Sequence, residues 1–140
     1  MDKKTFKKVI SEVLSGYGFK VGKDKCFRAE TNELIVVIGL QKSNYSEVYY
    51  INYGFLIKLL SPDLTAPRDY QCDVKGRFIF GTDGIAYESL NEDKFTTAFI
   101  SELEKRVKPV LDSGLKKYFE LFPNYTITAN LKAKKYLNMV

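Results

Sequence analysis

Residues 34–43 read LIVVIGLQKS, and residues 47–57 read EVYYINYGFLI. Both segments are rich in β-branched and aromatic residues, which favour strands. Residues 43–46, SNYS, lie between the two apolar runs and are typical of a turn. The two segments together therefore predict one long β-hairpin around which the rest of the chain must fold.

The residue pattern also predicts how the two strands pair. If Lys42 lies opposite Glu47, Ile38 lies opposite Ile51, and the four pairs that Leu34, Val36, Ile38 and Leu40 make are all apolar or aromatic, as a buried face requires. The other pairs in this register are Leu34–Phe55, Val36–Tyr53 and Leu40–Tyr49. Because side chains alternate across a strand, a shift by one residue would mix the two faces. We therefore expect one face of the hairpin to lie in the core.

The opposite face of the hairpin is mixed and forms the candidate binding face. Gly39 and Gly54 remove side chains from otherwise bulky strands, which is typical of a bulge or of a close approach by backbone or ligand. Gln41, Tyr50 and Asn52 share this face and could supply donors and acceptors around the resulting hollow. The alternative is that a terminal helix covers this face, with Tyr50 lying over Gly39.

Helical patterns flank the strand-rich middle of the chain. Apolar residues recur at helical spacing from Phe6 to Tyr17, and Gly16 and Gly18 end that helix. Further strands are expected at residues 19–21, 25–31, 74–80 and 85–87, with a turn at residues 81–84 and the longest loop at residues 61–69.

The C-terminal part predicts three helical segments. Ser89 and Glu92 have the spacing of a capping box ahead of the first. Pro109 ends or kinks that helix, and the last, basic helix is expected at residues 127–138. The predicted fold is α+β: an antiparallel sheet of about four to five strands with a central long hairpin, packed by an N-terminal helix and C-terminal helices in a single domain spanning residues 1–140.

The composition lacks the side chains that most common enzyme reactions need. The chain has no histidine, so Ser-His and Cys-His pairs and histidine-ligated metals are excluded. Its two cysteines, Cys26 and Cys72, cannot complete a tetrahedral zinc site within one chain. Phosphate-loop, dinucleotide and nucleophile-elbow patterns do not occur. We therefore predict no catalytic residues, no metal site and no cofactor, and the balance favours a protein that is not an enzyme.

The sequence also predicts a cytoplasmic protein with no membrane partner. Charged residues at the start of the chain replace the apolar region of a signal peptide. The longest apolar run, residues 34–40, is far shorter than the roughly 20 residues that span a bilayer. In the cytoplasm both cysteines are expected to be reduced. They could form a redox pair if they lie close in space, or they could be inert buried thiols.

The formal net charge of +5 is unevenly distributed along the chain. Residues 1–28 and 105–140 are strongly basic, whereas residues 29–104 are acidic. Basic terminal helices could bind nucleic acid, which is one alternative function. The other interpretation is that these lysines only solvate the outer faces of helices, since no arginine-rich cluster accompanies them.

A second alternative comes from a short motif. Pro62-Asp63, followed after nine residues by Asp73-Val74-Lys75, fits the loose pattern of PD-D/E-x-K nucleases. In that chemistry two acidic residues hold Mg²⁺ and a lysine positions or activates water. The pattern is degenerate, and Asp63 falls in a proline-broken loop instead of at a strand end, so a Mg-dependent nuclease is the least favoured function.

Several short motifs occur in a characteristic order. They are Gly18-Phe19-Lys20, Phe27-Arg28, Gln41-Lys42-Ser43, Ile51-Asn52-Tyr53-Gly54, and Cys72 with Arg77. Together, over residues 5–110, they resemble a bacterial family known as domain-of-unknown-function family 4304. The resemblance implies a small α+β domain with no established activity, substrate or cofactor, and so no catalytic residues to transfer.

The polar residues within these motifs are further candidates. Arg28, Gln41, Lys42, Asn52 and Arg77 all fall on predicted strands, where polar side chains either satisfy backbone and loop groups or line a site. The leading hypothesis is a non-enzymatic binding or accessory module that recognises another protein through its sheet or through the loop at residues 61–69. An immunity-like or inhibitory role is one version of it. The oligomeric state is left open.

Overall fold

The computed structural model describes residues 1–82 and 84–140. Five antiparallel strands form one open sheet in the order β1-β2-β3-β4-β5. The strands are β1 Lys20–Val21, β2 Phe27–Glu30, β3 Leu34–Lys42, β4 Tyr49–Ile57 and β5 Val74–Arg77. The helices are α1 Lys3–Gly16, α2 Glu92–Arg106, α3 Lys108–Ser113, α4 Leu115–Leu121 and α5 Leu131–Tyr136, with 3-10 turns η1 Asp69–Gln71, η2 Tyr87–Ser89 and η3 Pro123–Thr128. The α+β prediction is confirmed.

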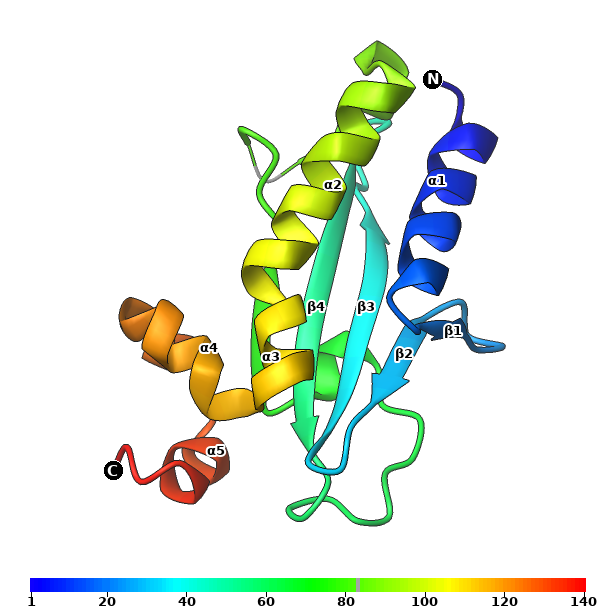
Figure 1. Ribbon diagram of the computed structural model, residues 1–140. Coiled ribbons are helices and arrows are strands. Elements are labelled where there is room, and N and C mark those ends of the chain that lie inside the picture. Colours follow the sequence, from blue (N-terminus) through cyan, green and yellow to red (C-terminus); the bar gives the residue numbers. More distant parts are fainter. Residues whose placement is uncertain (83) are drawn as a thin grey trace.

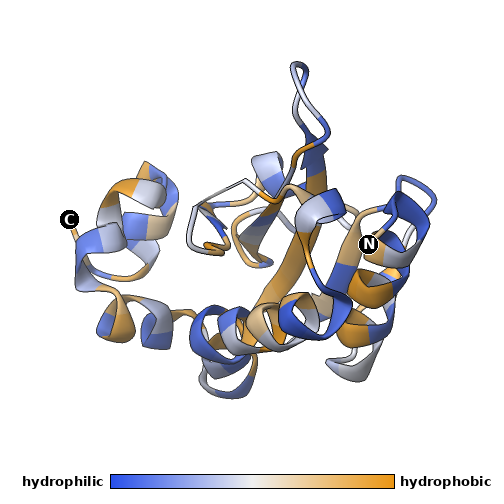
Figure 2. Ribbon diagram, turned by 90° about the horizontal axis from the view of Figure 1, so that it is seen from above, coloured by the Kyte–Doolittle hydropathy of each residue, from blue (hydrophilic) through white to orange (hydrophobic). Residues whose placement is uncertain are grey.

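Helices α1 and α2 lie side by side along the long β3–β4 hairpin (Figure 1). Their apolar faces and the inner face of the sheet form the main core, to which Phe6, Tyr53, Phe55 and Phe99 contribute fully buried side chains. Figure 2 shows the hydrophobic strands in the middle of the molecule. Burial of these side chains is the dominant favourable term in folding. No helix in the described part of the chain has the length and apolar character needed to cross a membrane.

The hairpin forms as predicted, but its predicted register is wrong by two residues. Ile38 pairs with Tyr53, not with Ile51, and Lys42 pairs with Tyr49. The observed register brings fully buried Ile57 into the sheet opposite Leu34 and leaves exposed Glu47 in the loop. A two-residue shift keeps every side chain on its predicted face, because the side-chain period of a strand is two. The pattern that separates the faces therefore could not distinguish the two registers.

One expected strand and two expected helix starts after β5 differ from the predictions. Residues 85–87 form no strand: Ile85 makes an isolated bridge to Tyr49 and η2 follows. Helix α2 begins at Glu92, because the Asn91 side chain accepts hydrogen bonds from two first-turn N–H groups, a better cap than Ser89. The last helix begins at Leu131 for the same reason, with Asn130 as its cap. The predicted turn at residues 81–84 includes Asp83, which lies outside the described residues.

The C-terminal helices are fastened to the sheet by a carboxylate from the β2–β3 turn. The backbone N–H of Leu115, at the start of α4, donates to Glu33 Oε1 at 2.8 Å. The Tyr136 hydroxyl of α5 donates to Glu33 Oε2, also at 2.8 Å. Gly114 breaks α3 from α4 at φ +92°, a conformation that favours glycine. One side chain thus positions two helices that are separated in sequence.

Candidate functional site

The loop between β4 and β5 covers part of the outer face of the sheet. Its η1 turn lies over the two hairpin glycines: a Cβ on Gly39 would lie 2.5 Å from Asp69 Oδ1, and a Cβ on Gly54 would lie 2.6 Å from the Cβ of Cys72. The close approach that the glycines predicted is therefore made by this loop, and not by a terminal helix. Beneath it is a second, small core of buried side chains, Cys26, Ile35, Val37, Leu56 and Cys72.

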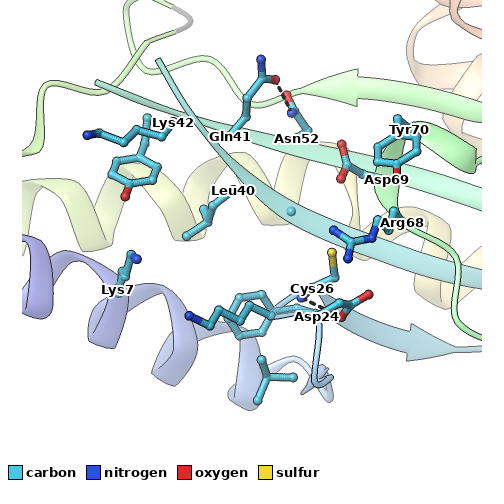
Figure 3. Close-up of a pocket in the computed structure, with 15 residues that line it drawn as sticks. Lys7, Asp24, Cys26, Leu40, Gln41, Lys42, Asn52, Arg68, Asp69 and Tyr70 are labelled. Atoms are coloured by element: carbon cyan, nitrogen blue, oxygen red, sulfur yellow. Dashed lines mark hydrogen bonds between the residues drawn. The ribbon is translucent and has the colours of Figure 1, made fainter. Parts of the chain in front are cut away.

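Beyond the glycines, four polar or aromatic side chains gather on the same outer face. Arg77 donates from Nε to Asn52 Oδ1 at 2.8 Å and from Nη2 to Gln41 Oε1 at 3.1 Å. Asn52 Nδ2 donates to Gln41 Oε1 at 3.0 Å (Figure 3). The Arg77 guanidinium lies 4.3 Å from the centre of the Tyr50 ring, a cation–π distance. We call Gln41, Tyr50, Asn52 and Arg77 the outer polar cluster.

The sheet register explains why these four residues meet. Gln41 pairs with Tyr50 across β3 and β4, and Asn52 pairs with Arg77 across β4 and β5. Residues 50 and 52 lie on one face because alternate side chains share a face. Three of the five residues predicted for the binding face, Gln41, Tyr50 and Asn52, therefore lie together, joined by Arg77 from the separate group of polar strand residues.

Two hollows flank the outer polar cluster. The first, the β3 hollow, has a volume of about 670 Å³ and extends from the cluster past Leu40 toward α1 (Figure 3). The second, the β5 hollow, has a volume of about 560 Å³ and lies over β5. Both are lined by Gln41, Asn52, Asp69 and Tyr70. Gln41 and Asn52 of the cluster thus contribute to the walls of both hollows, and the cluster with the two hollows makes up one candidate surface.

Exposed apolar side chains border this surface. Tyr70 is 64% exposed and Ile79 is 44% exposed, and both line the β5 hollow. Sequence reasoning identified neither residue, and it included Asp69 only as the last residue of the loop at residues 61–69. Gly39 and Gly54 signalled that some segment must approach the sheet, but no local pattern showed that residues 69–72 would be that segment.

Arg28 and Lys42 lie outside the outer polar cluster. Arg28 Nε donates to the Pro67 carbonyl at 2.9 Å, and its Nη1 donates to Asp24 Oδ1 at 3.1 Å. The hydrogen bond from Arg28 lowers the pKa of Asp24 to about 2. Arg28 therefore ties the β4–β5 loop to the β1–β2 turn. Lys42 pairs with Glu47 at 3.0 Å across the hairpin loop, although it also lines the β3 hollow.

The nuclease pattern lacks the structural context that it needs. Asp73 is buried, and its Oδ2 accepts from the Ile57 N–H at 2.8 Å while its Oδ1 accepts from Asn130 at 2.9 Å. Asp63 and Lys75 are both exposed, the former in the loop. Among residues 1–82 and 84–140, no three acidic or cysteine side chains are placed to hold a metal ion. The Asp73 carboxylate instead holds the Ile57 N–H and the Asn130 side chain in place.

The two thiols lie in the small core beneath the loop. Both are free and buried. Burial raises the pKa of Cys72 to about 12, and it also raises the pKa of Cys26. Protonated, shielded thiols are poor nucleophiles, so these cysteines act as small apolar side chains.

Several basic side chains of the terminal helices are already paired. Arg106 is buried and donates to Glu102 at 2.8 Å. Lys108 pairs with Asp112 at 2.6 Å one helical turn away. Lys8 and Lys117 have acidic partners on their own helices at 3.9 and 3.8 Å. This arrangement favours the interpretation that many of these residues solvate helix surfaces.

The fold and this surface define a class of protein: an α+β domain with helices on one face of an open antiparallel sheet and a loop over part of the other. More particularly, residues 10–113 match the family described as domain of unknown function DUF4304, and the chain belongs to that family. The matched range includes all five strands and the outer polar cluster. Comparison with curated proteins gave no match, and neither did comparison with solved structures.

Proposed function

We propose that this protein is a non-enzymatic, cytoplasmic protein-binding module that recognises its partner through the outer polar cluster and the two hollows. The observation that carries the proposal is the position of exposed Tyr70 and Ile79 beside the hydrogen-bonded Arg77. Tyrosine and arginine are enriched at protein interfaces, where they supply much of the binding energy. Because the cluster is already held by hydrogen bonds, its side chains lose little further freedom on binding.

The chemistry of the cluster suits recognition better than catalysis. Its members are two amides, a guanidinium and a phenol, which donate and accept hydrogen bonds. The cluster contains no carboxylate or thiol, and the chain has no histidine to act as a general base. An inhibitory or immunity-like role is the version in which the bound partner is an enzyme or a toxin, and saturable loss of that partner's activity would support it.

The test compares capture by three forms of the full chain. Tagged wild type is compared with the double variant Tyr70→Ser and Ile79→Ser, which removes the apolar border of the β5 hollow. The matched control is Ile127→Ser, because Ile127 is 87% exposed and does not line either hollow. We expect a stoichiometric partner to be retained by wild type and the control, and lost by the double variant.

Two outcomes would contradict the proposal. One is equal retention of the partner by all three forms when urea denaturation shows them to be equally stable. The other is capture of nucleic acid alone with an affinity that falls steeply as salt is raised, which would favour the alternative based on the basic terminal helices.

A further inference from the structure

Strand β3 extends beyond its neighbour β2. The β2–β3 pairing ends at Phe27 opposite Ile38, whereas the β3–β4 pairing continues to Lys42 opposite Tyr49. Residues 39–42 of β3 therefore have a strand partner on the β4 side only, within the part of the chain that the structure describes. This open edge, residues 39–42, forms one wall of the β3 hollow.

The register shows which backbone groups face the open edge. The Thr31 N–H donates to the Leu34 carbonyl at 2.9 Å, so even-numbered residues of β3 direct their N–H and C=O groups toward β2. On the other side, Ser43 bonds to Val48 next to β4. By the same alternation, the N–H and C=O groups of Leu40 and Lys42 point into the β3 hollow, where an added strand would meet them.

The hollow offers an apolar floor and a positive rim to such a strand. Its apolar lining includes Leu40, Phe27 and the exposed Val21. Lys7 of α1 faces Leu40 across the hollow (Figure 3). The charged lining consists of Lys7, Lys25, Lys42, Arg68, Asp24 and Asp69. Because Arg28 neutralises Asp24 and Lys42 is paired with Glu47, the remaining lining charges are three cations and Asp69.

We infer that the partner segment bound here is an extended acidic peptide that adds as a strand along Leu40 to Lys42. Backbone hydrogen bonds to an exposed sheet edge supply the affinity in this mode, and alternate side chains supply specificity. In this arrangement one set of the peptide's side chains packs on Leu40, and the peptide's carboxylates lie near Lys7, Lys25 and Arg68. The inference rests on the proposed protein-binding function, and it names the chemistry of the partner.

The probe is a displayed library of random ten-residue peptides, selected on the full chain. Enriched peptides are synthesised and their binding is followed by amide hydrogen exchange. We expect alternating acidic and apolar sequences that protect the Leu40 and Lys42 amides. Lys42→Pro removes the edge N–H without touching the β4 pairing, and it should weaken binding by about tenfold, the worth of one hydrogen bond. Lys42→Ala is the matched control, since it loses the same ion pair but keeps the N–H.

A second pair of variants tests the charge. Lys7→Glu should weaken binding by about fivefold, whereas Lys8→Glu, on the same helix but not in the lining of the hollow, should leave it unchanged. The inference is overturned if no peptide is enriched, if the enriched peptides are not acidic, or if Leu40 and Lys42 exchange as in the free protein. It is also overturned if the edge pairs with a second copy of the chain in preference to a peptide.

The two proposals fail separately. If Lys42→Pro keeps the natural partner while the Tyr70 and Ile79 double variant loses it, the protein-binding function stands and strand addition is wrong. If the selected peptides bind as expected but no partner depends on Tyr70 and Ile79, the open edge is a peptide site and the surface assigned under the proposed function is wrong.

Discussion

Asp73 and Asn130 join the sheet to the C-terminal segment through two hydrogen bonds. The Asn130 side chain donates to Asp73 Oδ1 at 2.9 Å, and the Asn130 backbone N–H donates to the Asp73 carbonyl at the same distance. The second carboxylate oxygen of Asp73 accepts from the N–H of Ile57 at the end of β4. Asn130 also caps α5 by accepting from the Ala133 N–H. A single buried carboxylate thus couples β4, β5 and the last helix.

Replacement of Asp73 by alanine should therefore destabilise the protein strongly. The substitution leaves the buried Ile57 N–H without its acceptor and frees the Asn130 side chain, so we expect a loss of about 2–4 kcal/mol in the free energy of unfolding. Urea denaturation measures it. Asp63→Ala, in the exposed loop, is the control and should change stability by less than about 0.5 kcal/mol. Equal effects of the two substitutions would show that Asp73 does not hold this junction.

The buried hydroxyls of Tyr53 and Tyr118 lie 2.7 Å apart. Burial raises the pKa of both, so each stays protonated and able to donate. Tyr53→Phe and Tyr118→Phe should each cost about 1–2 kcal/mol, because each substitution removes the hydrogen bond between the two buried hydroxyls. The double variant should cost less than the sum of the two. A double-mutant cycle from urea melts checks this, and strict additivity would mean that the hydroxyl pair contributes nothing.

Arg28 should control both the Asp24 carboxyl and the β4–β5 loop. The Arg28 hydrogen bond lowers the pKa of Asp24 to about 2, so its stabilising effect is present above the unfolded pKa of about 3.9 and is lost as the pH falls through 2. In Arg28→Met, NMR titration should return the Asp24 pKa close to the unfolded value. The loop at residues 61–69 should also exchange its amides faster, since the bond to Pro67 is lost. An unchanged Asp24 pKa would contradict this account.

The Cys72 thiol predicts a loss of stability at alkaline pH. Its pKa is raised to about 12 by burial, whereas an unfolded thiol titrates near 8.5. The native state therefore holds the proton more tightly, and stability should fall as pH rises from about 8.5 toward 12, with this thiol contributing a slope of at most about 1.4 kcal/mol per pH unit. Cys72→Ala removes that contribution. Parallel pH profiles of wild type and variant would show that the thiol is not the cause.

The pattern of the hairpin was sufficient to predict its two faces but not its register. Alternation places Ile38 and Gly39 on opposite faces of the hairpin. A shift of the pairing by two residues leaves those faces unchanged, because the side-chain period of a strand is two. The choice between Ile51 and Tyr53 as the partner of Ile38 depends on which residues the core buries, and that is a property of the packed molecule. The candidate cluster survives the correction for the same reason: Gln41, Tyr50 and Asn52 keep their face.

The amino-acid sequence by itself determined the α+β class, the buried and outer faces of the hairpin, and the absence of histidine chemistry. Each of these follows from local periodicity or from composition. Only the tertiary structure decided that Asp69 and Cys72 lie over the glycines, that Arg77 joins Asn52 and Gln41, and that β3 extends beyond β2. The physical reason is that these are contacts between segments far apart in the chain, set by how strands and loop pack together and not by any local preference.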